Sequence, residues 1–118
     1  MRAKDAVGHY GENVAARHLA AAGLSVVERN WRCPDGEIDI VARHGEVLVF
    51  CEVKTRSGVA YGVPAEAVTP AKAARIRRLA LRYLAEHRLA FTELRFDVVS
   101  VICQPRGAAA VEHLPAAF

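Results

Sequence analysis

The sequence predicts an α/β fold in which a mixed β-sheet is flanked by helices. Three observations support this prediction: two segments have helical periodicity, the apolar runs outside them are short and rich in β-branched residues, and turn-forming residues separate these runs. The expected order is one helix, three strands, one helix and two strands (α-β-β-β-α-β-β). Because 118 residues suffice for one hydrophobic core, we expect a single domain over residues 1–118.

The first half of the chain is predicted to form one helix and three strands. The helix covers residues 8–22 and ends before a glycine, which is a typical C-cap residue. A strand follows at residues 24–31, and Pro34-Asp35-Gly36 is a strong turn signal. The next two strands, residues 37–42 and 46–55, are joined by so short a connection that they should form a hairpin.

The second half is predicted to form a long connection, a helix and two strands. The connection, residues 57–68, contains glycine and proline, and we expect a short helical turn at 65–67. Thr69-Pro70 marks the start of a helix that should end near His87, because threonine is a favoured N-cap and proline suits the first helical position. Its predicted core face consists of Ala73, Ile76, Ala80, Tyr83 and Leu84. The remaining strands are residues 94–103 in the interior of the sheet and 109–114 at its edge.

Composition limits the class of protein to which the chain can belong. Hydrophobic residues make up 53% and charged residues 25%, as in ordinary globular chains. No apolar stretch is long enough to span a membrane and the N-terminus lacks the apolar region of a signal peptide, so we expect a cytoplasmic protein with no membrane partner. The three cysteines, Cys33, Cys51 and Cys103, fit neither a disulfide framework nor a zinc motif. A net charge of +3 permits nucleic-acid binding without establishing it.

The strand at residues 46–55 carries charge where a buried strand should be apolar. Residues 47–51 form an unbroken apolar run, which predicts a central strand buried on both faces. Glu52 and Lys54 follow, and because side chains alternate along a strand they point to the same face, about 7 Å apart. Two charges in a nearly dry layer are costly unless they are compensated. Either they compensate each other, or a metal ion and a phosphate compensate them, and the two alternatives imply different functions.

Asp39 joins Glu52 on this face if the hairpin has a two-residue loop. A loop at residues 44–45 places Asp39 opposite Phe50 and Glu37 opposite Glu52. The three acids then share one face, and Asp39 and Glu52 are diagonal neighbours about 7–8 Å apart at Cα, close enough to bind one cation together. A loop with an odd number of residues would instead put Asp39 on the opposite face.

Glu12 heads the apolar face of the first helix. The other members of this face are Ala15, Ala16, Leu19 and Ala22. An acid in the first turn of a helix is stabilised by the helix dipole, which accounts for Glu12 without any function. Its place on the inner face also allows it to reach a site on the sheet, so both interpretations stay open.

The second helix carries a stripe of positive charge. Only Glu86 is acidic within this helix, so the stripe is not a surface of mixed sign. A stripe of one sign favours contact with a phosphate backbone over an ordinary solvated face. The predicted nucleic-acid contacts are Lys72, Arg75, Arg78 and Arg82, with Arg77 nearby, and Arg56 at the end of the charged strand.

An acid on a helix, an acid on one strand and Glu-x-Lys on the next strand form the layout of the PD-(D/E)xK nucleases. The corresponding residues here are Glu12, Asp39, Glu52 and Lys54. This layout suits phosphodiester hydrolysis because the substrate is an anion and water must become nucleophilic near neutral pH. Carboxylates can hold Mg²⁺ for both purposes, and a lysine can orient or deprotonate the water or stabilise the charge that develops on the phosphate.

Five segments of the chain together resemble the bacterial YraN-like family, whose members look like archaeal Holliday junction resolvases. These segments are residues 8–12, 36–41, 50–56, 64–68 and 95–99. The resemblance covers nearly the entire chain. It implies a restriction-endonuclease-like fold for the α/β domain predicted above.

The resemblance also implies a function, a metal-dependent endonuclease acting on DNA, including branched DNA in repair or recombination. It implies that Glu12, Asp39, Glu52 and Lys54 are catalytic and that the three acids bind Mg²⁺ or Mn²⁺. Glu37 would be an additional ligand or would tune the site, and a homodimer is admitted. The alternative is a non-catalytic module that binds nucleic acid or a protein partner and keeps the acids as a structural network.

Overall fold

The computed structural model describes residues 3–57 and 68–118, and its elements follow the predicted order. They are α1 (Ala3–Ala21), β1 (Ser25–Cys33), β2 (Gly36–His44), β3 (Val47–Ser57), α2 (Pro70–Glu86), β4 (Glu93–Cys103) and β5 (Ala110–Leu114). The helical turn predicted at residues 65–67 lies outside the described residues. Neither α1 nor α2 is long and apolar enough to cross a membrane.

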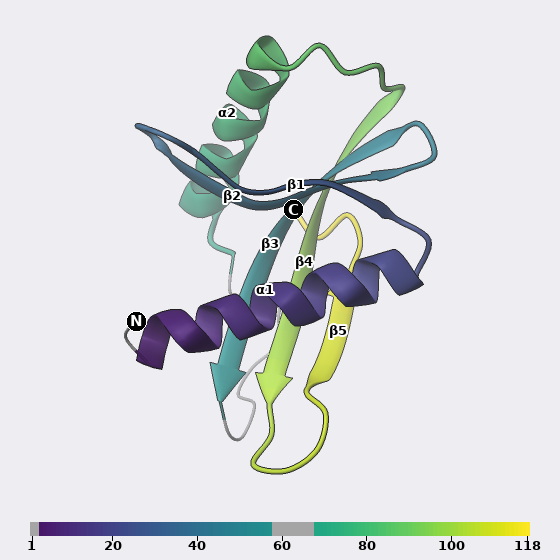
Figure 1. Ribbon diagram of the computed structural model, residues 1–118. Helices are drawn as coiled ribbons and strands as arrows, with labels where there is room; N and C mark the ends of the chain where they lie inside the picture. The colour runs from purple at the N-terminus through teal and green to yellow at the C-terminus, as the bar shows by residue number, and fades with distance from the viewer. Residues whose placement is uncertain (1–2, 58–67) are drawn as a thin grey trace.

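The strands form one mixed sheet in the order β1-β2-β3-β4-β5 (Figure 1). Neighbouring strands are antiparallel except β3 and β4, which are parallel along their whole length. Parallel neighbours need a crossover connection, and α2 lies in the connection between these two strands. β3 is the middle strand of the sheet, as its apolar run predicts, and the mixed α/β fold is confirmed.

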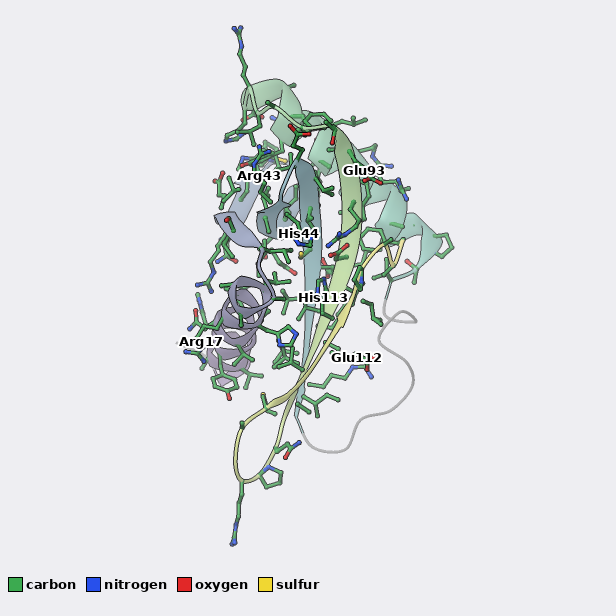
Figure 2. All side chains as sticks on the ribbon, turned by 90° about the vertical axis from the view of Figure 1, so that its right-hand side faces the viewer. Arg17, Arg43, His44, Glu93, Glu112 and His113 are labelled. Atoms are coloured by element: carbon green, nitrogen blue, oxygen red, sulfur yellow. The ribbon has the colours of Figure 1, made fainter. Side chains whose placement is uncertain are left out.

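The two helices cover opposite faces of the sheet, as the edge-on view shows (Figure 2). α1 crosses β3, β4 and β5 on one face (Figure 1). There it buries Ala15 and Leu19 against Val49, Val99 and Val101 of β3 and β4. The inner face of α1 is thus the one that the sequence predicts, although Ala22 at its end is exposed.

α2 packs on the other face through Ile76, Leu79, Ala80 and Tyr83. These side chains meet aromatic residues of three strands: Trp31, Phe50 and Phe96. Leu79 is missing from the predicted core face of α2, although its helical position lies between Ile76 and Tyr83. Since Phe50 on β3 faces α2, the residues of β3 that share its parity, among them Glu52 and Lys54, also project toward the α2 side.

Helix α1 begins at Ala3, earlier than the predicted start at residue 8. The reason is that residues 3–7 contain good helix formers, and Gly8 costs a helix only about 1 kcal/mol, which is too little to stop it. The end agrees with the prediction, since Gly23 adopts a φ of 96° after the last turn. α2 also begins as predicted, with the Thr69 side chain accepting a hydrogen bond from the backbone N–H of Lys72 at 3.1 Å.

The β2–β3 hairpin has a two-residue loop, but it is Gly45-Glu46 and not the predicted 44–45. His44 pairs with Val47, so the partner of Phe50 is Val41, and the predicted pairing of Phe50 with Asp39 is wrong. Glycine is favoured as the first loop residue because that position takes a positive φ, and Gly45 has φ 62°. The whole register therefore moves by two residues. A shift of two keeps the paired residues on their predicted faces. Ile38, however, packs with Phe50 on the α2 side whereas Ile40 packs on the α1 side, so the regular alternation of β2 breaks around Asp39.

Candidate active site

The candidate site lies where β2 and β3 separate. Their backbone pairing ends at Ile40 and Cys51, and Asp39 and Glu52 are the next residues along each strand. Just beyond this point the backbone N–H of Val53 donates a hydrogen bond to Asp39 Oδ2 at 2.8 Å. A side-chain oxygen of β2 thus takes the place that a backbone carbonyl has within the ladder. The predicted pairing of Glu37 with Glu52 does not form, because the strands are no longer paired here.

Strand β1 is irregular at the same level of the sheet. Asn30 lies across from Asp39, between two regular β1–β2 pairs, and has a φ of 54°. Asparagine tolerates this left-handed conformation better than most residues. Such conformations gather at functional sites, where the surrounding structure holds them in place.

Three carboxylates meet at the fork, that of Glu12 from α1 and those of Glu37 and Asp39 from β2. One oxygen from each lies within 4.8 Å of the other two. Gly11 explains how Glu12 reaches β2, since a Cβ at Gly11 would overlap the side chain of Thr55 on β3. The missing side chain lets α1 approach β3 closely. Because α1 begins at Ala3, Glu12 lies in the third turn of the helix, and its interpretation as a first-turn acid at the helix dipole is wrong. Tertiary packing places Glu12 instead.

A pocket of about 490 Å³ opens beside these carboxylates. It is lined by residues of α1, β2 and β3: Val7, Gly8, Glu12, Asp39, Val53, Lys54 and Thr55. Two acids and a lysine thus border the same space. A cation and a phosphodiester could meet there.

Burial and crowding raise the pKa of Asp39 from 3.8 to about 7. Burial is the largest cause and the charge of Glu52 the second, whereas the hydrogen bond from Val53 acts in the opposite direction. The charges of Glu12 and Glu37 raise the pKa further. A cation bound among these acids would stabilise the ionised form of Asp39. The cluster therefore has the electrostatics of a cation site.

Glu52 lies beside this group and is held by two lysines. Its Oε1 is 2.6 Å from Nζ of Lys72 on α2 and 3.6 Å from Nζ of Lys54. Burial and the neighbouring Lys72 ammonium lower the pKa of Lys54 below 10.5. Burial acts to lower the pKa of Lys72 as well, but the ion pair with Glu52 outweighs it and raises that pKa. The sequence places Lys72 on the phosphate-binding stripe and gives no local signal that it reaches Glu52.

Glu37 belongs to the cluster of three carboxylates and also forms an ion pair with Arg32. Arg32 Nε lies 2.7 Å from Glu37 Oε2, and the arginine side chain is 76% exposed. So exposed an ion pair is worth little. The ion pair with Arg32 therefore does not prevent Glu37 from binding a cation.

The oxygen donors at the fork fit Mg²⁺ or Mn²⁺, which prefer carboxylate ligands. At about 2.1 Å from Mg²⁺, opposite ligands of an octahedron are about 4.2 Å apart. Oxygens that lie within 4.8 Å of one another need only small side-chain movements to reach this spacing. Glu12, Glu37 and Asp39 could hold such a cation, with Glu52 next to them.

The other cations predicted to bind nucleic acid differ in their surroundings. Arg82 forms ion pairs of 3.2 Å with Glu86 and with Asp35 of the β1–β2 turn. Arg75 and Arg78 are exposed and, with Asp35 and Arg82, line a pocket of about 250 Å³. Among the described residues, the ion pairs of the stripe involve its two ends, Lys72 and Arg82.

Two further arginines lie closer to the sheet. The guanidinium of Arg77 stacks on the ring of Phe96, 4.6 Å from its centroid. Arg56 belongs to the last part of β3 and is half-buried. Arg77 is an exposed residue of α2 beside the stripe, whereas Arg56 lies on the sheet.

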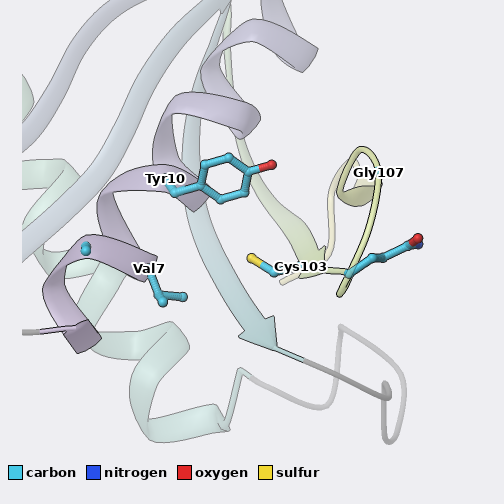
Figure 3. A pocket seen from close by; sticks show the side chains of 6 residues that line it. Val7, Tyr10, Cys103 and Gly107 are labelled. Carbon is cyan, nitrogen blue, oxygen red and sulfur yellow. The ribbon is translucent and has the colours of Figure 1, made fainter.

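A third pocket, of about 280 Å³, lies between the start of α1 and the β4–β5 connection (Figure 3). Val7 borders this pocket and the first pocket beside the carboxylates, and Tyr10, Cys103 and Gly107 surround this one. No charged side chain is among its lining residues within the described chain. The charged groups of the candidate site therefore belong to the first pocket.

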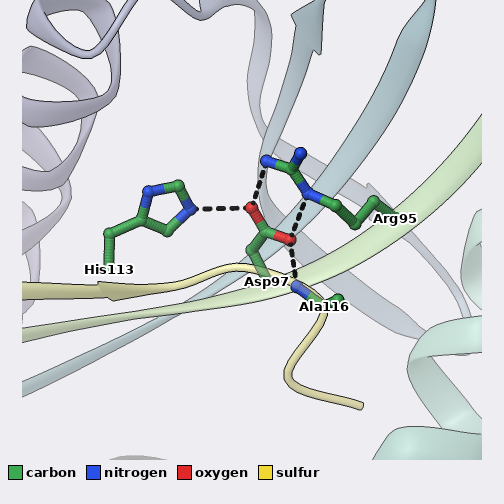
Figure 4. Close-up of polar contacts among 4 residues, drawn as sticks. All are labelled: Arg95, Asp97, His113 and Ala116. Atoms are coloured by element: carbon green, nitrogen blue, oxygen red, sulfur yellow. Dashed lines mark hydrogen bonds and ion pairs between the residues drawn. The ribbon is translucent and has the colours of Figure 1, made fainter.

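Asp97 of β4 is fully buried, and its partners are Arg95, His113 and Ala116 (Figure 4). Arg95 donates two hydrogen bonds of 2.9 Å to its carboxylate, Ala116 N–H donates one of 3.0 Å, and His113 Nε2 lies 2.7 Å away. Burial acts to raise the pKa of Asp97, but these partners lower it below 3.8. Asp97 thus has a structural role. It lies in the interior of β4.

The chain thus forms an α/β domain in which a five-stranded mixed sheet carries α1 and α2 on its two faces, and acids and lysines meet where β2 and β3 separate. A Holliday junction resolvase of the archaeal hyperthermophile Archaeoglobus fulgidus has a similar structure, with a TM-score of 0.51 over 92% of this chain and 76% of that chain. At 19% sequence identity, this likeness shows the fold alone. The restriction-endonuclease-like fold expected from the sequence is thereby confirmed.

The chain belongs to the uncharacterised protein family UPF0102, whose model matches residues 11–101. A UPF0102 protein of Beutenbergia cavernae is 67% identical over 97% of this chain and 97% of its own length. A UPF0102 protein of Frankia alni is 62% identical over 100% and 98%, respectively. The resemblance to the YraN-like family is thus confirmed.

Proposed function

We propose that the fork between β2 and β3 is the active site of a metal-dependent endonuclease that hydrolyses phosphodiester bonds in DNA. The observation that carries this proposal is the meeting of three carboxylates, each with an oxygen within 4.8 Å of the others, beside a pocket that Glu12, Asp39 and Lys54 line. The acids come from α1 and β2, which are distant in sequence. Burying them together opposes folding, as the raised pKa of Asp39 reflects, and such a cost is typical of functional sites.

Each residue of the fork has a distinct task in this proposal. Glu12, Glu37 and Asp39 would hold the divalent cation, and Glu52 next to Asp39 would complete its ligands. When bound, the cation would neutralise phosphate charge and make a water more acidic. Val53 keeps Asp39 in place through its backbone hydrogen bond. Lys54 orients the attacking water, or donates a hydrogen bond to the phosphate as its negative charge grows.

DNA is the proposed substrate because of the charge on α2. Exposed Arg75 and Arg78 follow Lys72 on one side of the helix, so a phosphate backbone could leave the fork along α2. The similarly folded archaeal protein is a Holliday junction resolvase, which makes branched DNA the first substrate to test. A four-way junction offers two equivalent strands, so paired cuts would need a homodimer with two sites.

A second candidate function is a non-catalytic module that binds nucleic acid or a protein. The specific observation in its favour is that Glu52 forms ion pairs with both Lys72 and Lys54. Under this alternative the charges of β3 compensate each other and the site is part of the scaffold. The alternative leaves the meeting of Glu12 with Glu37 and Asp39 without a purpose.

The two candidates are separated by a cleavage assay. The purified protein is incubated with a four-way junction, a flapped duplex, a single strand and a linear duplex, each with Mg²⁺, Mn²⁺ or EDTA. We expect cleavage of at least one DNA with Mg²⁺ or Mn²⁺ and none with EDTA. Asp39→Asn, which keeps an acceptor for Val53, should remove the activity. If no DNA is cut and no cation binds, the endonuclease proposal is wrong.

A further inference from the structure

Lys72 is tied more closely to Glu52 than the lysine of the Glu-x-Lys motif is. Both ammonium groups approach the same oxygen, Glu52 Oε1, but Lys72 lies at 2.6 Å and Lys54 at 3.6 Å. The Lys72 side chain is 24% exposed and that of Glu52 is 12% exposed, so water screens this ion pair only partly. Lys72 is therefore the main ion-pair partner of Glu52, the carboxylate that should complete the cation site.

The position of Lys72 is fixed by the beginning of α2. Thr69 caps the helix through a hydrogen bond to the backbone N–H of Lys72 itself, and Pro70 sets the first helical turn. The backbone at Lys72 is thus firmly placed. Its side chain has four rotatable bonds beyond the backbone and can turn to another anion without moving the helix.

This contact also explains which acids group together. Glu12, Glu37 and Asp39 meet within 4.8 Å, whereas Glu52 is not part of that group although it lies next to Asp39 at the fork. An ammonium at 2.6 Å holds Glu52 Oε1. A divalent cation close to this ammonium would be repelled by it.

We propose that Lys72 is a positioning residue that holds Glu52 in place of a divalent cation and turns to a DNA phosphate when the cation binds. The inference rests on the endonuclease function proposed above. Lys72 opposes cation binding in the free protein, since it must first release Glu52. It favours DNA binding, since the released ammonium points along the side of α2 where exposed Arg75 follows. Cation and DNA thereby help each other to bind.

The test measures cation affinity and DNA affinity separately in the full chain. The variants are Lys72→Gln, which removes the charge, Lys72→Arg, which keeps it, and Arg75→Gln, which removes a charge one turn further along the exposed side of the same helix. Mn²⁺ binding is measured by calorimetry without DNA. Binding of a four-way junction is measured with Ca²⁺, which occupies oxygen sites and is expected not to support cleavage.

Lys72→Gln should bind Mn²⁺ about tenfold more tightly than the unchanged protein and bind the junction several-fold more weakly. Lys72→Arg and Arg75→Gln should change the Mn²⁺ dissociation constant by less than about twofold. A structural role for Lys72 would not produce opposite effects on the two ligands. If Lys72→Gln does not fold, Lys72→Met, which keeps the aliphatic stem, takes its place, and thermal melts confirm folding.

Two results would overturn the inference, and they have different meanings for the endonuclease proposal. If the unchanged protein binds Mn²⁺ and cuts DNA but a folded Lys72→Gln variant binds Mn²⁺ equally or more weakly, only the role of Lys72 is wrong. If the unchanged protein neither binds Mn²⁺ nor cuts DNA, the endonuclease proposal fails together with this inference.

Discussion

At the scale of single residues, Asp39 links the backbone of the sheet to the charge of the site. It accepts a hydrogen bond from Val53 and lies among Glu12, Glu37 and Glu52. Its pKa in the folded protein is about 7, above the ordinary value of 3.8, so the folded state binds this proton more tightly than the unfolded state does. The free energy of unfolding should therefore fall as the pH rises from about 4 to about 7.

The first prediction concerns this pH dependence. Asp39→Asn keeps an acceptor for Val53 and removes the buried charge, so in EDTA at pH 8 the variant should be more stable by roughly 1–3 kcal/mol. At pH 4 the two proteins should differ much less, because Asp39 is protonated there. Urea unfolding at both pH values measures the difference. A variant that is less stable at both values would show that the Asp39 charge does not oppose folding.

The second prediction concerns Asp97, whose charge acts in the opposite sense. Asp97→Asn leaves Arg95 without its buried partner, so at pH 7 the free energy of unfolding should fall by about 3–5 kcal/mol. The pKa of Asp97 is depressed, so its stabilisation is complete above about pH 4 and is lost as the pH falls through the folded-state pKa. The difference between variant and unchanged protein should shrink accordingly in acid. A difference that stays constant down to pH 2 would contradict the role given to the carboxylate charge.

At the scale of elements, the approach of α1 to β3 depends on one glycine. A methyl group at Gly11 would overlap Thr55, whereas nothing lies within 4 Å of a Cβ built at Gly8 in the same helix. The two glycines are therefore a matched pair. Both lie in α1, so a difference between their alanine variants reports the contact with Thr55 and not the helix propensity of alanine.

The third prediction uses this pair. Gly11→Ala should lower the free energy of unfolding by about 1–3 kcal/mol because α1 must move away from β3. Gly8→Ala should raise it by about 0.5–1 kcal/mol because alanine favours the helix. Gly11→Ala should also reduce any cleavage, since Glu12 moves with the helix. Chemical unfolding of both variants is the measurement, and equal stabilisation by both would show that α1 does not need the close contact.

The fourth prediction concerns the exposed face of α2. If Arg75 and Arg78 contact phosphates, their joint replacement by alanine should flatten the dependence of log K on log salt concentration by about two units. Arg17 on α1 and Arg106 in the β4–β5 connection are also exposed and lie on other elements, so their joint replacement is the control. DNA binding is measured between 50 and 200 mM salt. An unchanged slope in the Arg75/Arg78 variant would make the stripe an ordinary solvated face.

At the scale of the whole molecule, the order of elements and the central place of β3 could be predicted because they follow from local signals. Apolar periods, Thr69-Pro70 and the turn glycines are each visible within a few residues. The exact hairpin register could not be predicted, since 44–45 and 45–46 are both two-residue loops next to Gly45. The two alternatives differ by two residues and so give the paired residues the same faces. The break in the alternation of β2 between Ile38 and Ile40 has no local signal in the sequence.

The contact of Lys72 with Glu52 could not be predicted, because it depends on how the whole of α2 packs on the sheet. Helical periodicity places Lys72 with Arg75 and Arg78, and only the packing of Leu79 and Tyr83 against the sheet turns the first residues of α2 toward β3. The position of Glu12 could not be predicted either. It depends on the close approach of Gly11 to Thr55, which are far apart in the sequence. Local patterns thus identified the chemical groups, and tertiary packing determined which of them meet.

The fifth prediction separates enzyme from scaffold through the stability of the whole molecule. Because the acids come from α1, β2 and β3, a bound cation would join three elements and stabilise the fold by about 2.7 kcal/mol at 100 times its dissociation constant. Glu52→Gln should fold but lose most of this gain together with cleavage. Lys54→Ala should keep the gain and lose cleavage, since lysine acts on water or phosphate and not on the cation.

If the charges are only scaffold, Mg²⁺ stabilises none of the three proteins. Glu52→Gln then breaks the ion pairs with Lys72 and Lys54, and its free energy of unfolding falls by up to about 3–5 kcal/mol. Thermal melts with Mg²⁺ and with EDTA, beside the cleavage assay, distinguish these two patterns.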